Sequence, residues 1–177
     1  MPRELTAFLE AGPPPVYFGF GSTPGLEPDA MTSMICEALD QAGRRGILAT
    51  GGGALGSGKK SDRVLFLTDA PHDCLFPHVA SVVYHGGAGT TGASLRAGKP
   101  TAICPFLGDQ PFWARRVSKL GVGPAPLDRK ALSPAALAHA ITEMETARMR
   151  QRATELGAAI QRDRGVENAV RFVLTRL

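Results

Sequence analysis

Residues 81–92 read Ser-Val-Val-Tyr-His-Gly-Gly-Ala-Gly-Thr-Thr-Gly, a short apolar run joined to a glycine-rich turn. The run from Ser81 to Tyr84 contains β-branched and aromatic residues and ends at the glycines, which predicts a buried β-strand. A helical pattern follows the turn and continues up to Gly98. The stretch therefore predicts a strand, a tight turn and a helix, the repeating unit of an α/β fold.

The same alternation continues on both sides of this stretch. Further strands are expected at five apolar runs: Val16–Phe20, Gly46–Thr50, Val64–Leu67, Thr101–Cys104 and, as a short sixth strand, Val122–Ala125. Helical spacing occurs at 31–42, at 110–120 and from Pro134 to the end, with a stop at Gly43 and interruptions near Ala147 and at Gly165. Strands that are apolar throughout and alternate with helices predict a doubly wound, Rossmann-like α/β fold. Its parallel sheet has about six strands, with helices on both faces and a helical C-terminus.

Length and composition fit one globular domain. The chain has 177 residues, of which 44% are hydrophobic and 20% charged. Its formal charge of +4 is spread over scattered basic residues with no run of five, so no nucleic-acid partner is expected. Three cysteines without paired spacing argue against a disulfide framework and indicate a reducing, cytoplasmic compartment. No apolar run is long enough to span a membrane.

The first fifteen residues differ in character from the rest. Residues 1–15 read as a short helical lead-in or linker that ends in Pro13-Pro14-Pro15, and they lack the apolar core of a signal peptide. Further sequence is expected upstream of Met1. Residues 16–177 are expected to form the folded domain.

Ligands in an open parallel sheet bind beyond the carboxyl ends of the strands, so the residues at those ends are the candidates. The most informative segment is 85–92. Its glycines allow a close backbone approach, and the following helix offers free N–H groups and the positive end of its dipole. Thr90 and Thr91 add hydroxyl groups, and His85 can donate to a phosphate oxygen. The segment predicts an anion site; the simpler alternative is a tight turn with capping threonines.

Two glycine motifs suggest other nucleotide sites. Residues 87–92 match G-x-G-x-x-G, the fingerprint of an NAD site, but they follow the fourth strand and not the first. Residues 53–60 nearly match a Walker A loop, but Lys60 replaces the required Ser or Thr, and a strand follows where a helix is needed. We expect a mobile surface loop at 53–60.

No metal site is expected, because the four histidines lack ligand spacing to one another or to cysteine pairs. Asp109 and Gln110 follow the fifth strand, and together they offer several acceptors and two donors, which suits sugar hydroxyls. The alternative is that Asp109 caps the next helix, with Pro111 in its first turn. Both interpretations place these residues at the ligand edge of the sheet.

Three segments in this order resemble the C-terminal, donor-binding domain of family 1 glycosyltransferases, which form half of a GT-B fold. They are GFGS at 19–22, APHDCLFPHVASVVYHGGAGTTGASLRAGKP at 70–100 and PFLGDQPFWARRV at 105–117. The resemblance covers residues 14 to 177. It is strongest to sterol 3-beta-glucosyltransferases and then to bacterial antibiotic and carotenoid glycosyltransferases.

The resemblance implies roles for individual positions. The donor diphosphate is expected at Gly21, Ser22, His85, Gly87, Ala88, Gly89, Thr90 and Thr91; the nucleobase at Ala70, Pro71 and His72; and the donor sugar at Asp109 and Gln110. Where the plant branch of the family has a tryptophan that stacks on the base, this chain has Asp69. Where that branch has a ribose-binding glutamate, this chain has Ala93 or Ser94.

The resemblance also implies a function. The chain is expected to bind a UDP-sugar, preferably UDP-glucose with a dTDP-sugar as the alternative, as the donor half of an inverting, metal-independent hexosyltransferase without a cofactor. The acceptor, a lipophilic alcohol such as a sterol, and the catalytic base are expected on a separate N-terminal domain or subunit. Peripheral membrane association is expected through that half only. A stand-alone nucleotide-sugar-binding module and an NAD-binding fragment remain alternatives.

Overall fold

The computed structural model describes residues 1–23, 27–58, 61–69 and 71–176. Five parallel strands form one sheet in the order β3-β2-β1-β4-β5. Their bounds are Val16–Gly19 for β1, Gly46–Ala49 for β2, Val64–Leu67 for β3, Ser81–Tyr84 for β4 and Thr101–Ile103 for β5. In the centre of the sheet, Val16 of β1 pairs with Gly46 of β2 and Ser81 of β4. The strand order reverses between β1 and β4, so the carboxyl ends of these two strands form the switch point at which such sheets bind ligands.

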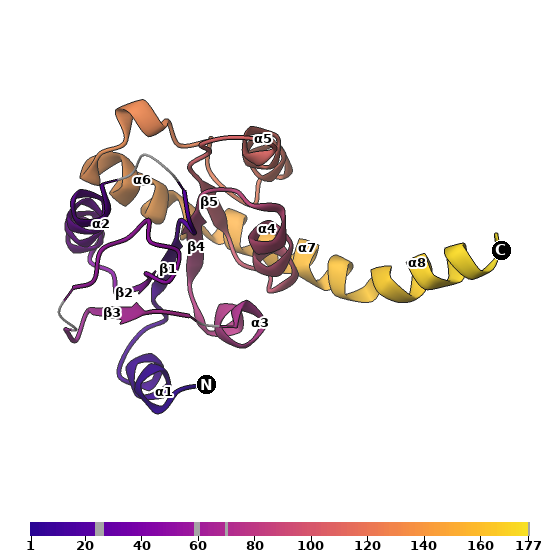
Figure 1. Cartoon of the computed structure of the whole chain (residues 1–177), viewed down its shortest axis with the longest axis horizontal. Helices are drawn as coiled ribbons and strands as arrows, with labels where there is room; N and C mark the ends of the chain where they lie inside the picture. Colours follow the sequence, from indigo (N-terminus) through magenta and orange to yellow (C-terminus); the bar gives the residue numbers. More distant parts are fainter. Residues whose placement is uncertain (24–26, 59–60, 70, 177) are drawn as a thin grey trace.

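Helices cover both faces of the sheet, so the predicted doubly wound α/β fold is confirmed. The helices are α1 (Arg3–Glu10), α2 (Pro28–Ala42), α3 (His72–Leu75), α4 (Ala88–Arg96), α5 (Gln110–Leu120), α6 (Pro134–Met144), α7 (Ala147–Arg162) and α8 (Gly165–Leu174), with short 3-10 turns at Phe76–His78 and Arg129–Ala131. In Figure 1, α2 and α6 lie on one side of the sheet and α3, α4 and α7 on the other. Two separate apolar cores result, one on each face of the sheet.

Several predicted boundaries agree with the structure to the residue, including β3, β4 and α5. The expected sixth strand at 122–125 is absent from the described residues. The backbone there still follows β5: Thr101 N–H donates to the Val122 carbonyl, and Leu127 N–H donates to the Ile103 carbonyl. Pro124 and Pro126 carry no N–H group, so the segment cannot complete a ladder and remains irregular.

The lead-in helix α1 packs onto the domain. Leu5 and Phe8 are buried with the core on the α3 side of the sheet. Arg45, at the start of β2, lies over the Phe8 ring at 3.9 Å and donates to the carbonyls of Phe8 and Pro13. This cation–π contact and its hydrogen bonds hold the lead-in against the sheet.

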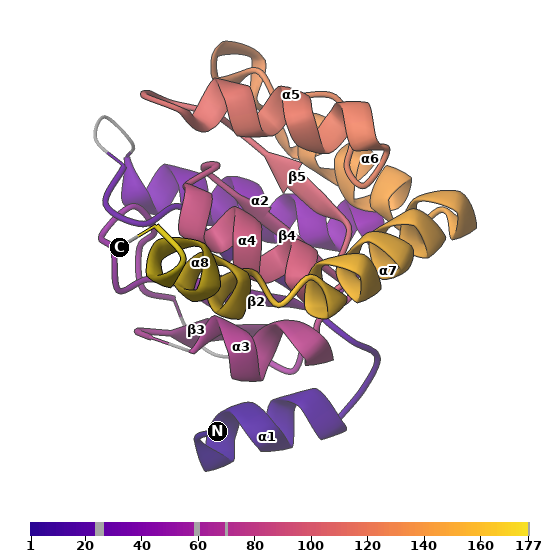
Figure 2. The same ribbon diagram turned by 90° about the vertical axis from the view of Figure 1, so that its right-hand side faces the viewer.

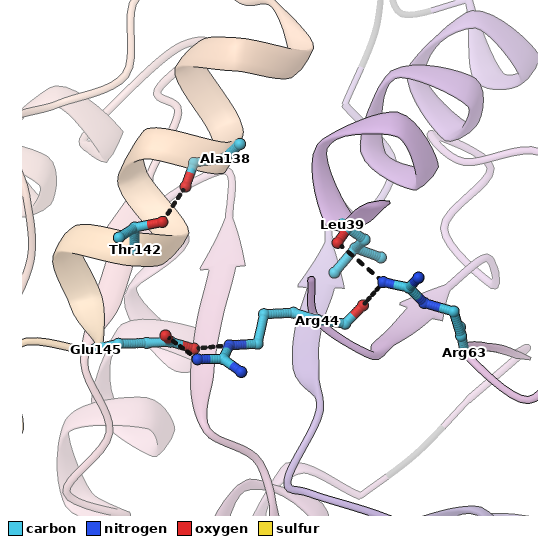
Figure 3. Close-up of polar contacts among 6 residues, drawn as sticks. All are labelled: Leu39, Arg44, Arg63, Ala138, Thr142 and Glu145. Carbon is cyan, nitrogen blue, oxygen red and sulfur yellow. Dashed lines mark hydrogen bonds and ion pairs between the residues drawn. The ribbon is translucent and has the colours of Figure 1, made fainter. Parts of the chain in front are cut away.

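A second arginine connects segments that are far apart in the chain. Arg44 forms a two-pronged ion pair with Glu145, which follows α6 (Figure 3). In the same view, Arg63 donates to the carbonyls of Leu39 and Arg44 at 3.5 and 3.4 Å. These contacts join the end of α2 to the end of α6, the two helices that cover the same face of the sheet. Because Arg44 is well exposed, we expect its ion pair to contribute at most about 1 kcal/mol.

The last helix leaves the body of the molecule. Figure 1 shows α8 extending beyond the sheet and its covering helices, and in Figure 2 the same helix lies in front of the body, toward the viewer. Arg164, with φ of 47°, separates it from α7, and none of its residues is buried. Its large apolar side chains are exposed: Val166, Val170, Phe172, Val173 and Leu174. Among the described residues, no helix is both long and apolar enough to cross a lipid bilayer.

Candidate functional site

A pocket of about 350 Å³ opens at the carboxyl ends of β1, β2, β3 and β4. Its walls come from the turns that follow these four strands and from the start of α3 and α4. The lining residues are Tyr17, Gly19, Gly21, Ala49, Gly51, Gly52, Thr68, Asp69, His72, His85 and Thr90. The pocket therefore lies at the switch point of the sheet, where the sequence places the candidate anion site.

One end of the pocket lies beside the N-terminus of α4. Gly87 is the N-cap residue, and it provides no side chain to cap the helix. The first hydrogen bond of the turn runs from Thr91 N–H to the Gly87 carbonyl at 2.9 Å. The amides of Ala88, Gly89 and Thr90 therefore lie at the open end of the helix, where an anion can accept hydrogen bonds from them.

His85 is enclosed by two glycine turns next to these amides. A Cβ atom added to Gly87 would lie 2.8 Å from His85 Nε2, so a larger residue at 87 would displace the imidazole. A Cβ atom added to Gly21, whose φ is +57°, would lie 3.3 Å from His85 Cε1. His85 Nδ1 lies 3.4 Å from the Gly19 carbonyl, and its Nε2 lies on the side of Gly87 and the helix amides.

The two threonines of this turn point to different places. Thr90 lines the pocket, as the prediction of a hydroxyl donor to phosphate requires. Thr91 is only 1% exposed; its hydroxyl donates to the Gly87 carbonyl at 2.9 Å and accepts from the Tyr84 hydroxyl at 2.6 Å. The expectation that Thr91 also offers its hydroxyl to the diphosphate is therefore wrong, because both its side chain and its amide bond within the domain.

The other end of the pocket is aromatic. His72, the first residue of α3, stacks on Phe76 with the ring centroids 4.4 Å apart, and its Nε2 lies 3.2 Å from the Tyr17 hydroxyl. Burial lowers the pKa of His72, while the nearby Asp69 and Asp73 carboxylates raise it, and the net pKa is lowered. Burial, aided by the Asp69 charge, raises the pKa of Tyr17 to about 12. At neutral pH both rings are therefore uncharged.

Pro71 and Ser22, also expected at the nucleobase and the first turn, are not among the residues that line the pocket. Pro71 is exposed and precedes α3, where its carbonyl accepts from the amides of Cys74 and Leu75. Ala70 lies outside the described residues. Ser22 is exposed beside Gly21, at the rim of the turn that follows β1.

Asp109 and Gln110 lie at the carboxyl end of β5, beyond the residues that line the pocket. Gln110 is 8% exposed, and its Oε1 accepts from the amides of Phe106 and Leu107 at 2.7 and 3.0 Å. That oxygen is occupied within the loop and cannot accept from a sugar hydroxyl. Asp109 is exposed, and its Oδ2 accepts from Trp113 Nε1 at 2.8 Å. It stands at the N-cap position of α5 with Pro111 in the first turn, as the alternative predicts, but its side chain accepts no hydrogen bond from the helix amides.

Seven of the eleven lining residues were not among the predicted site residues, and four of these seven lie in the turns after β2 and β3. Gly51 and Gly52 follow β2, and Thr68 and Asp69 follow β3. A Cβ atom on Gly51 would lie 1.9 Å from the Thr68 carbonyl oxygen, and one on Gly52 would lie 2.1 Å from the Gly21 carbonyl carbon. The turns after β1, β2 and β3 thus touch through their backbones. Their shared position at strand carboxyl ends was the signal that could have identified them.

The near-Walker loop has a structural role. Ala54 and Leu55 are buried, and Gly56 exchanges hydrogen bonds with the Thr32 hydroxyl of α2. The expected mobile surface loop is therefore wrong for 54–56, which pack against α2; Lys59 and Lys60 lie outside the described residues.

Comparisons with known proteins agree with this geometry. A protein-family model described as "Erythromycin biosynthesis protein CIII-like, C-terminal domain" matches residues 60–165. A sterol 3-beta-glucosyltransferase of Arabidopsis thaliana is 47% identical over 177 residues, which cover 99% of this chain and 28% of that protein. The vancomycin aglycone glucosyltransferase of Amycolatopsis orientalis is 42% identical over 174 residues, which cover 97% of this chain and 41% of that protein. The chain thus spans less than half the length of these relatives.

Solved structures show the same fold. The structure of Phytolacca americana UGT2 complexed with UDP-2fluoro-glucose and pterostilbene gives a TM-score of 0.80 at 20% identity, over 100% of this chain and 45% of that one. The calicheamicin glycosyltransferase CalG4 gives 0.75 at 23% identity, over 92% of this chain and 42% of that one. The chain has the architecture of one half of a GT-B fold. It belongs to the erythromycin biosynthesis protein CIII-like family of C-terminal domains, which are the donor-binding domains of glycosyltransferases.

Proposed function

We propose that this chain binds UDP-glucose as the donor half of an inverting, metal-independent glycosyltransferase that acts on a lipophilic alcohol. The names of its relatives support glucose as the sugar, since both relatives described above are glucosyltransferases. The Arabidopsis relative supports a sterol acceptor. The acceptor site and the catalytic base belong to an N-terminal domain or subunit that completes the enzyme.

The observation that carries this proposal is the polarity of the pocket. The uncapped N-terminus of α4, His85 and Thr90 offer hydrogen-bond donors at one end, which suits a diphosphate. Asp69, at the other end, repels anions, and His72 offers an aromatic ring there. A ligand with an anionic end and a neutral aromatic end fits this arrangement, and a nucleoside diphosphate has both.

The proposed reaction is one displacement at the anomeric carbon of the donor sugar. The acceptor oxygen forms a bond to that carbon as the bond to the diphosphate oxygen breaks, and the configuration inverts. The bonding electron pair leaves with UDP, and the acceptor proton goes to a base outside this chain. Negative charge grows on the leaving diphosphate, so the open amides of α4 and His85 would stabilise the transition state more than the ground state.

The test of donor binding is calorimetry of the 177-residue chain with UDP and with UDP-glucose, each with and without a metal chelator. We expect binding that the chelator does not change. NADH serves as the control ligand for the G-x-G-x-x-G alternative, and we expect no binding of it. Absence of UDP binding at millimolar concentration, or binding of NADH instead, would overturn the proposal.

The test of catalysis separates an enzyme half from a stand-alone binding module. Alone, the chain should not transfer glucose to a sterol, because the acceptor hydroxyl needs a base within hydrogen-bond reach. Joined to the N-terminal domain of a sterol glucosyltransferase, it should regain transfer. If UDP-glucose binds but the joined protein remains inactive with several N-terminal domains, the binding-module alternative is favoured.

A further inference from the structure

The ring of His72 is held from two directions inside the aromatic end of the pocket. One face stacks on Phe76, with the two planes inclined by only 15°. Tyr17 meets the imidazole nearly edge-on, at 82° with 5.6 Å between centroids, and it contacts Phe76 in the same way at 5.0 Å. The three rings therefore touch one another pairwise, which leaves His72 one orientation in which its Nε2 faces the Tyr17 hydroxyl.

The hydrogen bond between Tyr17 and His72 has a preferred direction. Both groups are neutral at pH 7, because burial raises the pKa of Tyr17 and lowers that of His72. A phenol is a good donor and a poor acceptor, whereas an unprotonated imidazole nitrogen is a good acceptor. The hydroxyl therefore donates to Nε2 at 3.2 Å, and the ring hydrogen must be on Nδ1.

The second ring nitrogen remains available for a ligand. Among the described residues, no hydrogen bond to His72 Nδ1 occurs. The one buried side-chain atom without a partner in that part of the chain is Ser81 Oγ. His72 is half-buried and lines the pocket, so a ligand in the pocket can approach its ring. Phe76 covers one face of the ring, so the opposite face is the one that a planar ligand can reach.

We propose that Tyr17 is a positioning residue for nucleobase binding: its hydroxyl fixes His72 as the Nδ1–H tautomer, so that Nδ1–H donates to a base carbonyl. This inference rests on the proposed function, because it assigns the neutral end of the pocket to a base. Tyr17 is only 4% exposed, although it lines the pocket, and it acts through His72. No local sequence pattern indicates this pair, because its members are 55 residues apart.

The first test needs no ligand. Long-range ¹H–¹⁵N correlation spectra of the 177-residue chain should show His72 as the Nδ1–H tautomer at pH 7.5. In Tyr17→Phe, which keeps the ring and removes the hydroxyl, the spectrum should shift toward the Nε2–H form. A wild-type His72 that is already in the Nε2–H form would overturn the proposal even if Tyr17→Phe failed to fold.

The second test separates the base from the phosphates by using UDP and inorganic pyrophosphate as probes. Loss of one hydrogen bond predicts that Tyr17→Phe binds UDP about 3- to 10-fold more weakly, while pyrophosphate affinity changes less than twofold. The matched control is Tyr84→Phe, which also removes a buried phenol hydroxyl but one bonded to Thr91 in the core. Its affinity for both probes should change less than twofold.

The outcomes distinguish this inference from the proposed function. Equal weakening of UDP and pyrophosphate by Tyr17→Phe, or unchanged UDP affinity, would overturn the positioning role while the proposed function stands. If the wild-type chain binds UDP no more tightly than pyrophosphate, both the positioning role and the proposed function are overturned. Calorimetry at one pH and salt concentration gives all of these affinities.

Discussion

At the scale of residues, the same turn places one threonine in the pocket and the other in the core. Thr90 lines the pocket, whereas the Thr91 hydroxyl is bonded on both sides within the core. Adjacent positions on a helix point about 100° apart, so only one of the two can face the pocket. The pair therefore permits a direct comparison between binding and stability.

The replacement of each threonine by valine, which keeps the shape and removes the hydroxyl, should give opposite results. Thr90→Val should weaken UDP binding by about 1.5–3 kcal/mol, the value of a hydrogen bond to a charged oxygen, and leave stability nearly unchanged. Thr91→Val should lower the free energy of unfolding by about 1–3 kcal/mol, because the Tyr84 hydroxyl loses its acceptor. Calorimetry and urea unfolding measure the two quantities. If Thr90→Val unfolds and Thr91→Val does not, the assignment of the two hydroxyls is reversed.

Asp109 and Gln110 are also adjacent, and we expect one to affect sugar binding and the other stability. Gln110→Ala should lower the free energy of unfolding by about 1–2 kcal/mol, because the amides of Phe106 and Leu107 lose their acceptor. Asp109→Ala, at an exposed site, should change stability by less than about 0.5 kcal/mol and should weaken UDP-glucose more than UDP. Equal loss of UDP and UDP-glucose in Asp109→Ala would contradict a role in sugar binding.

At the scale of elements, the pocket depends on turns whose backbones touch. Gly52 lies against the backbone of Gly21, and Gly51 against that of Thr68. These contacts bring the ends of β1, β2 and β3 closer than side chains would allow. The glycines after β2 are therefore part of the architecture of the site, although they provide no chemistry of their own.

Glycine-to-alanine replacements should reveal this difference. Gly52→Ala places a Cβ 2.1 Å from backbone and should cost about 1–3 kcal/mol of stability together with UDP affinity. The matched control is Gly92→Ala within α4, where nothing lies within 4 Å of the new Cβ; it should stabilise by roughly 0.5–1 kcal/mol. Thermal unfolding and calorimetry provide both readouts. A Gly52→Ala protein with unchanged stability and affinity would show that the turns can separate.

The element α8 is the least supported part of the chain. It has ten residues and none is buried, and isolated helices of this length are marginal in water. Its amides should exchange with solvent much faster than those of α7 in hydrogen-exchange mass spectrometry. Removal of residues 165–177 should change the free energy of unfolding by less than about 0.5 kcal/mol. Strong protection of α8 in the monomeric chain would contradict this expectation.

At the scale of the whole molecule, three buried acidic protons link stability to alkaline pH. Burial raises the pKa of Cys104 from 9.0 to about 12, and it raises those of Tyr17 and Tyr84 from 10.0 to about 12. The folded chain keeps these protons at pH values where the unfolded chain loses them. Their stabilising contribution is therefore complete below about pH 9 and is lost as the pH rises from 9 to 12.

Urea unfolding at pH 8, 9.5 and 11 should therefore show a falling free energy of unfolding. Cys104→Ala should reduce the slope most between pH 9 and 10, because the thiol titrates before the tyrosines in the unfolded chain; Cys74→Ala, at an exposed site, is the control. A flat profile up to pH 11 would mean that the folded chain releases these protons as readily as the unfolded chain does.

The sequence by itself determined the elements and the edge of the sheet that binds. Apolar periodicity is local, so it located β3, β4 and α5 to the residue, and the glycine turn at 85–92 indicated an open helix N-terminus. Strand alternation determined the doubly wound fold because parallel strands require crossover helices. It failed at 122–125, where the backbone follows β5 but two prolines prevent a strand.

Only the tertiary structure decided which side chains meet. Tyr17 reaches His72 across 55 residues, Arg44 reaches Glu145 across 101, and the Gln110 oxygen turns back to its own loop. Such partners depend on how the crossovers place β1 between β2 and β4, and on which way each side chain points from its element. Periodicity specifies that a residue is buried or exposed, but a hydrogen bond requires a particular atom at about 3 Å, and that distance is set by the packed fold.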